Sequence, residues 1–164
     1  MKQIITQLAS YTIWANKLVL GVINSLSQEQ QNAELASSFR SLYKTVLHMW
    51  RAEAIWWNRL NLQDKTEVPA ETLQVDFAIL SQHLLQQNKK WEFWLKDVAE
   101  ETLNQEFAYC NSKGEQFEQS VHEILIHVFN HSTYHRGQLV TMLRGLYVEK
   151  IPPTDFILFT RKKI

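Results

Sequence analysis

The sequence predicts an all-α fold: a four-helix bundle with a small β-hairpin before the last helix. Three observations lead to this prediction. Four long segments repeat apolar residues at steps of three or four, the period of an amphipathic helix. Only four glycines and three prolines occur, which favours long regular elements over a turn-rich β architecture. The 164 residues suffice to bury one good core, so we expect a single domain over 1–164.

Apolar periodicity defines the first three helices, which we expect at roughly 3–25, 38–60 and 71–99. The polar stretch 61–69 between the second and third helices contains a proline and reads as a loop. The apolar stripes consist of Ile4, Leu8, Tyr11, Ala15, Leu18 and Val22 on the first helix, Leu42, Val46, Met49, Ala52, Trp56 and Leu60 on the second, and Leu73, Phe77, Leu80, Leu84, Trp91, Leu95 and Val98 on the third.

The spacing of apolar residues changes after the third helix. Residues 105–118 hold short apolar runs on either side of a Ser-Lys-Gly turn, which predicts a β-hairpin. Ser120 and Glu123 then form a capping box, so we expect the fourth helix to begin there and to run to about Leu146. The tail carries an apolar run at 156–159 and should fold back onto the bundle.

Composition excludes several classes of protein. Lysine plus arginine and aspartate plus glutamate both number 17, and this zero net charge gives no electrostatic reason to expect nucleic acid or an acidic membrane as a partner. The single cysteine, Cys110, excludes an internal disulfide and a thiolate-rich metal site. No run approaches the roughly eighteen apolar residues of a membrane span, and the N-terminus does not resemble a signal peptide. We therefore expect a cytoplasmic protein.

The histidines need an explanation, because four of the six fall within the predicted fourth helix. On a helical wheel centred on Val128, His135 lies about 20° and His131 about 60° from the middle of the inward face. His127 lies near 100°, at the boundary, and His122 near 120°, facing solvent. His131 and His135 are therefore the inward pair, and their spacing of four lets two imidazoles reach one metal ion, as in HExxH.

The pattern alone leaves alternatives open. A buried histidine also occurs as a hydrogen-bonded core residue, and His127 and His131 share the same spacing, so either pair is able to bind. A third ligand must come from another helix, and His48 lies at the edge of the inward face of the second helix. His83 lies among polar residues and reads as a surface residue. Glu53 lies too far round from His48 to share an ion, so we expect it to pair with an inward arginine or tryptophan nitrogen.

Several segments resemble the DinB-like (DinB/YfiT-related) metal-binding family. They are His48 with the following MWRAEAIWW, HVFNHSTYHRGQL at 127–139 and PPTDFILF at 152–159, together with YTIWAN at 11–16, which is similar to the opening helix of that family. The resemblance implies a four-helix bundle with non-simple connectivity, often as a homodimer. It also implies a divalent metal ion, commonly nickel or zinc, held by three histidines.

Carried over to this chain, the resemblance assigns the metal ligands to His48, His131 and His135, in agreement with the inward pair of the wheel. It leaves His127 as a neighbour of the site. Other polar groups on the same helix are candidates for contacting the ligands or a substrate. These candidates are Asn130, Tyr134 and Gln138. We expect Arg136 at the helix surface or at a dimer interface.

Three neutral imidazoles leave a divalent ion with an open position, as catalytic sites do. Such an ion lowers the pKa of bound water to about 7 or holds a thiol as the nucleophilic thiolate. Characterised members of the resembled family include metal-dependent S-transferases that use low-molecular-weight thiols such as bacillithiol or mycothiol. We therefore expect a metal-dependent thiol S-transferase acting on a small molecule. The alternatives are a metal-dependent hydrolase and a non-enzymatic stress protein that binds a metal or small ligand.

Overall fold

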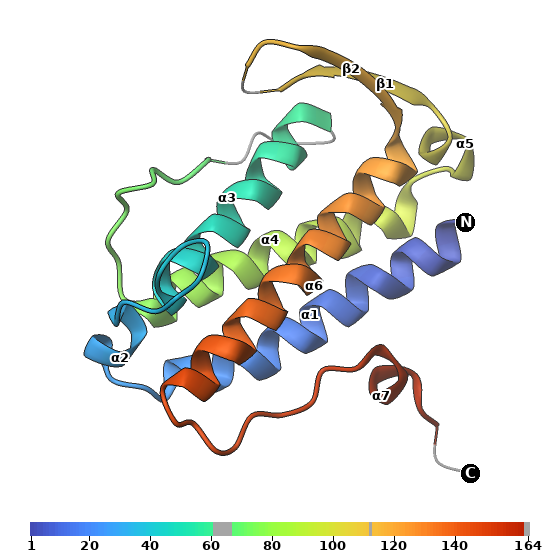
Figure 1. The fold of residues 1–164 in the computed structure, drawn as a ribbon. Coiled ribbons are helices and arrows are strands. Elements are labelled where there is room, and N and C mark those ends of the chain that lie inside the picture. The colour runs from blue at the N-terminus through green and yellow to red at the C-terminus, as the bar shows by residue number, and fades with distance from the viewer. Residues whose placement is uncertain (61–66, 112, 163–164) are drawn as a thin grey trace.

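The fold is a bundle of long helices with a two-stranded hairpin, seen in a computed structural model that describes residues 1–60, 67–111 and 113–162 (Figure 1). This confirms the predicted fold class. The long helices are α1 (Lys2–Asn24), α3 (Leu42–Leu60), α4 (Phe77–Asp97) and α6 (Val121–Gly145). The short elements are α2 (Gln28–Asn32), α5 (Glu100–Leu103), β1 (Glu106–Cys110), β2 (Gln116–Ser120) and α7 (Phe156–Thr160).

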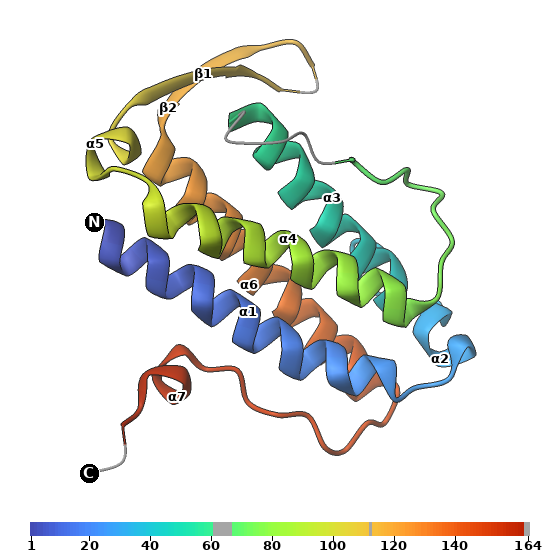
Figure 2. The ribbon, with the colours of Figure 1, turned by 180° about the vertical axis from the view of Figure 1, so that it is seen from behind.

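The helices are not arranged in chain order. Helices α1 and α3 each pack chiefly against α4 and α6, so the two lie at opposite corners of the bundle, as Figures 1 and 2 show from both sides. The segment containing α2 joins them at one end of the bundle. This is the non-simple connectivity that the resemblance implies, and it places α3 beside α6, the two helices that carry the candidate metal ligands.

The capping box at Ser120 starts α6 where the sequence predicts. The Ser120 hydroxyl accepts from the Glu123 amide at 3.4 Å, and the Glu123 carboxylate accepts from the Ser120 amide at 3.0 Å. Helix α4 begins at Phe77 rather than near residue 71. The preceding chain is bound to α3 instead, because the Tyr43 hydroxyl donates to the Leu73 carbonyl at 3.1 Å and accepts from the Val75 amide at 2.9 Å.

Part of the predicted loop at 61–69 can be compared with the structure. Residues 67–69 are not helical, and 61–66 lie outside the described residues. The predicted hairpin is present, with Tyr109 opposite Phe117 in an antiparallel register, and it lies over the end of α3 and the start of α6 (Figure 1). The tail folds back onto α1, where the Tyr11 hydroxyl donates to the Thr154 carbonyl at 2.7 Å and the Tyr11 ring meets Phe156 edge to face.

The core consists of two apolar clusters. One includes Leu80 and Leu84 at the end of the bundle near α2, and the other includes Trp57 and Trp91 near the hairpin. A layer of buried polar side chains lies between these clusters along all four long helices. Its members are Asn16 on α1, Glu53 on α3, Asn88 on α4, and Ser132 and Arg136 on α6.

The predicted stripe of α1 is confirmed at Tyr11 and Ala15, which are buried, but it is wrong at Ile4. Ile4 is 59% exposed, whereas Ile5 is fully buried. The reason is that α1 packs against two helices and the tail, so its buried face is wide and includes Thr12 and Asn16. Apolar periodicity cannot identify a buried face that has polar residues at its middle.

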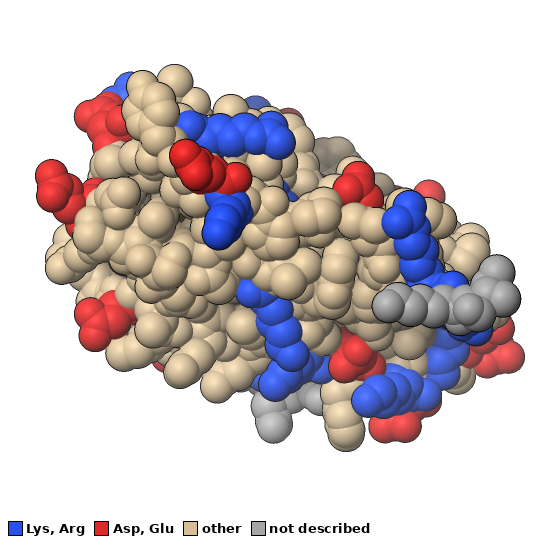
Figure 3. All heavy atoms as spheres, turned by 90° about the horizontal axis from the view of Figure 1, so that it is seen from below, with Lys and Arg blue, Asp and Glu red and all other residues tan. Residues whose placement is uncertain are grey.

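Among the described residues, no helix is long and apolar enough to cross a membrane. Charges of both signs are interspersed over the face of the molecule seen in Figure 3, which lies below the view of Figure 1. This distribution agrees with the balanced charge of the sequence.

Candidate metal centre

Three histidines from two adjacent helices converge between α3 and α6. His48 comes from α3, and His131 and His135 come from successive turns of α6. The Nε2 atom of His131 lies 3.2 Å from that of His48 and 3.0 Å from that of His135. One ring nitrogen from each of the three lies within 4.8 Å of the others, so the group could hold a metal ion. The structure thus brings together the three histidines that the resemblance assigns as metal ligands.

A hydrogen bond to Gln138 sets the protonation of His135. The Nδ1 atom of His135 lies 2.8 Å from Oε1 of Gln138, and the Gln138 amide nitrogen donates to the Ser38 hydroxyl at 3.2 Å. Because an amide oxygen only accepts, Nδ1 must carry the proton. The Nε2 atom of the neutral ring then presents a lone pair to the cluster, which is the arrangement seen in metal-bound histidines.

Burial keeps these imidazoles neutral. Burial and the neighbouring His135 lower the pKa of His48 to about 4, and the same causes lower the pKa of His131 to about 3. Burial also lowers the pKa of His135, against the opposing effect of its hydrogen bond to Gln138. At neutral pH all three rings are therefore in the form that binds a metal ion.

The residues present fit a divalent metal ion. Tetrahedral zinc with Zn–N bonds of about 2.0–2.1 Å places neighbouring ligand nitrogens roughly 3.3 Å apart, close to the separations from His131. His131 has one Nε2 facing two other Nε2 atoms, and a single proton on it satisfies only one of them. A cation at the centre would satisfy all three lone pairs. The three nitrogen donors and their separations therefore both suit a divalent metal ion.

A loop lies over the cluster. The Phe39 ring stacks on the His48 ring at a centroid distance of 3.9 Å and meets His135 edge to face at 5.6 Å. The next residue, Arg40, has a φ of 59°, and its carbonyl accepts from the Leu35 amide at 2.8 Å. Left-handed backbone at a residue other than glycine is uncommon and is retained where surrounding contacts enforce it. The loop is thus fixed in a conformation that holds Phe39 against two of the three clustered histidines, His48 and His135.

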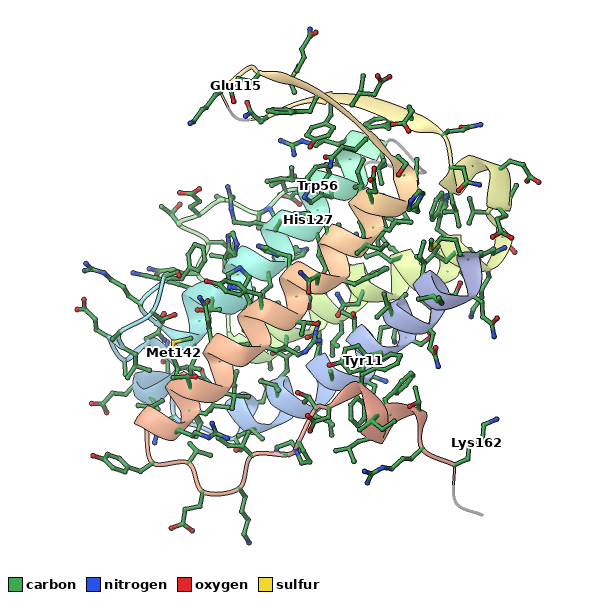
Figure 4. The ribbon with its side chains drawn as sticks, turned by 45° about the vertical axis from the view of Figure 1, so that its right-hand side comes forward. Tyr11, Trp56, Glu115, His127, Met142 and Lys162 are labelled. Atoms are coloured by element: carbon green, nitrogen blue, oxygen red, sulfur yellow. The ribbon has the colours of Figure 1, made fainter. Side chains whose placement is uncertain are left out.

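The other candidate residues take different positions. Tyr134 is exposed, and its ring meets His135 edge to face at 5.0 Å. His127 meets both His131 and Trp56, at 5.7 Å and 5.5 Å, and Figure 4 shows Trp56 and His127 side by side where α3 and α6 run together. Asn130 is exposed on α6. Gln138 therefore has the most direct contact with a ligand.

Two histidines outside the cluster are less exposed than predicted. His122 does not simply face solvent, because its Nδ1 lies 3.0 Å from the Leu103 carbonyl at the end of α5. His83 stacks on Trp50 with its ring nearly parallel, at 4.5 Å. Each ring has a structural partner, which accounts for these two histidines without a metal ion.

A buried polar network supports the cluster from behind. Asn88 donates to both carboxyl oxygens of Glu53 at 2.8 and 2.7 Å, and Asn16 donates to the Asn88 side-chain oxygen at 2.8 Å. Arg136 donates to Asn16 at 3.1 Å and to Ser132 at 3.0 Å. The prediction of a surface or interface position for Arg136 is wrong within this chain, since it is only 2% exposed. Ser132 follows His131 directly in sequence and Arg136 follows His135, so the network fixes the turn of α6 that carries both histidines.

Sequence reasoning missed Phe39, Ser38 and Arg51. The first two precede α3 in a segment without apolar periodicity, and their approach to the cluster depends on tertiary packing. Arg51 lies one turn after His48 on the same face of α3, a spacing that the sequence does show.

The family model of the DinB family matches residues 1–162. The chain belongs to the DinB family. Protein DinB of Bacillus subtilis (strain 168) is 26% identical over 160 residues, covering 93% of this chain and 91% of that protein. Among solved structures, a DinB-like protein from Bacillus cereus is similar with a TM-score of 0.70 and 17% identity, covering 90% of this chain and 94% of that one. A DinB-like protein from Bacillus subtilis gives a TM-score of 0.66 at 17% identity, covering 91% and 98%. Both structures share the DinB fold described above.

Proposed function

We propose that the protein is a divalent-metal-dependent enzyme that transfers a low-molecular-weight thiol to a small electrophile. The observation that carries the proposal is the convergence of three neutral imidazoles, with His131 Nε2 within 3.2 Å of both partners. Such a set holds zinc or nickel and leaves a position open for a further ligand. When bound, the ion supplies a thiolate at neutral pH by lowering the pKa of a coordinated thiol.

The protein's own side chains support this chemistry in specific ways. Gln138 holds His135 in the tautomer that binds metal. Phe39 covers one face of His48 and limits access of water from that side. Cys110, the one cysteine of the sequence, is exposed on the hairpin and is not part of the histidine cluster, so a thiol nucleophile would come from a second substrate. These features are compatible with transfer of an added thiol.

The test is an assay of metal-dependent thiol consumption. Protein loaded with zinc or nickel is mixed with a thiol such as cysteine and a panel of epoxides and alkyl halides, and free thiol is followed with time. We expect consumption above the uncatalysed rate that stops when a chelator removes the metal and is absent in His131→Ala. The matched control is His83→Ala, which changes a histidine stacked on Trp50 outside the cluster.

The same experiment separates the alternatives. Turnover of an activated ester without any thiol would replace the proposal with metal-assisted hydrolysis. Stoichiometric metal with no turnover of either kind would instead indicate a metal-binding or ligand-binding protein. The homodimer and the cytoplasmic location expected above remain predictions, to be tested by light scattering and by cell fractionation.

A further inference from the structure

A hollow of about 220 Å³ opens beside His48. This volume is below the roughly 300–1,000 Å³ of pockets that hold drug-sized ligands, so it suits a small ligand or one end of a larger one. A larger groove of about 790 Å³ shares Lys44, Leu47 and Glu71 with it, which gives a longer ligand room to extend. The hollow is lined by Phe39, Lys44, Leu47, His48, Arg51 and Glu71.

The lining combines apolar walls with two cations. Lys44 lies four residues before His48 and Arg51 three residues after it, so all three share one face of α3. Phe39 and Leu47 contribute the apolar surface. With Glu71 as the one carboxylate in the lining, positive charge is in excess.

Arg51 is held in place and still has hydrogen-bonding capacity. Its side chain is 21% exposed, donates to the Pro69 carbonyl, and lies 3.2 Å from the Glu71 carboxylate. The Glu71 side chain is 83% exposed, so solvent weakens this ion pair. A guanidinium offers five N–H donors in a planar fork that matches a carboxylate. Arg51 can therefore bind a second anion beside Glu71, or bind the carboxylate of a ligand in place of Glu71.

We propose that this hollow is a subsite for the carboxylate of the ligand that binds at the three-histidine site. The inference rests on the proposed function, because it assigns the anionic end of a ligand whose other end occupies the open metal position. Lys44 and Arg51 each lie about one helical turn from His48, and side chains at this spacing are neighbours on the helix surface, so we expect a ligand of two or three carbons to reach from the metal position to either cation. The implied substrate class is a small thiol that carries a carboxylate close to its sulfur atom.

Two thiols with the same three-carbon chain, one anionic and one neutral at its far end, test the subsite. 3-Mercaptopropionate and 3-mercapto-1-propanol have the same chain and thiol, but only the first carries a carboxylate. They are titrated into protein loaded with cobalt(II), and dissociation constants are read from the thiolate-to-cobalt absorption band. We expect the carboxylate to bind about tenfold more tightly, the strength of one charge-assisted hydrogen bond.

Variants of the hollow should shift this preference in opposite directions. Arg51→Met should abolish the preference for the carboxylate thiol. Lys44→Met, an exposed change that leaves the core intact, should reduce this preference. Glu71→Gln removes the competing carboxylate and should strengthen the preference. Arg144→Met is the matched control, since Arg144 is exposed in the last turn of α6.

The outcomes separate the two proposals. Absence of bound cobalt, or of the absorption band with either thiol, would overturn the proposed function and this inference with it. A band with both thiols at equal affinity would overturn the subsite alone. So would a preference for the carboxylate that survives in both Arg51→Met and Lys44→Met.

Discussion

Protonation of Glu53 makes a testable contribution to stability. Its side chain is 2% exposed and its carboxyl is contacted by Asn88 at the centre of the bundle. Burial raises the pKa of Glu53 to about 8, although the hydrogen bond from Asn88, the neighbouring Trp91 and the charge of Arg136 oppose the shift. Desolvation outweighs these opposing effects, because Arg136 donates its hydrogen bonds to Asn16 and Ser132 rather than to the Glu53 carboxyl. We therefore expect Glu53 to be protonated in the folded protein at neutral pH.

The sign of the pH dependence follows from this pKa. The folded state binds the proton up to a pH of about 8, whereas the unfolded chain releases it near the ordinary value of 4.5. The contribution of Glu53 to the free energy of unfolding is therefore fully present below pH 4.5 and is lost as the pH rises through 8. The slope is about 1.4 kcal/mol per pH unit, which amounts to roughly 5 kcal/mol over the whole interval.

Urea unfolding of the wild type and of Glu53→Gln, each at pH 5.5 and 7.5, measures the pH-dependent contribution of Glu53 to the free energy of unfolding. Glutamine does not titrate, and the histidines titrate in both proteins, so their contribution cancels in the difference. We expect the free energy of unfolding of the wild type, minus that of the variant, to fall by about 3 kcal/mol between the two pH values. Glu118→Gln, an exposed change on β2, controls for the loss of a surface carboxylate. A difference that stays constant would show that Glu53 is ionised throughout and that the reasoning is wrong.

Two further substitutions test the support of α6 and of its ligands. Gln138→Leu removes the acceptor that sets the His135 tautomer. It should lower the zinc affinity by about 10- to 100-fold, measured by competition with a chelator. The control Gln82→Leu, on the exposed face of α4, should leave the zinc affinity unchanged. Equal affinities in the two variants would remove Gln138 from the site. Ser120→Ala deletes the hydroxyl that caps α6 and should cost about 1 kcal/mol, which lowers the melting temperature by roughly 2–4 °C. A melting temperature unchanged by Ser120→Ala would contradict the role of this capping box with Glu123.

The fold was predictable from the sequence to the extent that local patterns determine it. The capping box at Ser120 and the Ser-Lys-Gly turn depend on neighbouring residues, so α6 and the hairpin appear where expected. The start of α4 differs, because Tyr43 binds the backbone at Leu73 and Val75 and keeps that segment extended. A contact between residues some thirty positions apart leaves no periodic signal in the segment itself.

The residues of the candidate site likewise fall into those predictable from local helix geometry and those that depend on contacts between distant segments. The spacing of His131 and His135 identified an inward pair by helix geometry alone. His48 was selected through the resemblance, because its approach to α6 depends on how the helices are connected. The position of Phe39 over the ligands and the burial of Arg136 depend on contacts between distant segments, so neither was predictable from periodicity.

Metal content is the most direct test of the central claim, that His48, His131 and His135 bind one metal ion. Purified protein is loaded with zinc or nickel, passed through gel filtration, and analysed by elemental mass spectrometry beside alanine variants of the three ligands and of His83. We expect one metal ion per chain in the wild type and in His83→Ala, and a large loss in each ligand variant. A wild type without metal, or metal retained equally in all three ligand variants, would contradict the account.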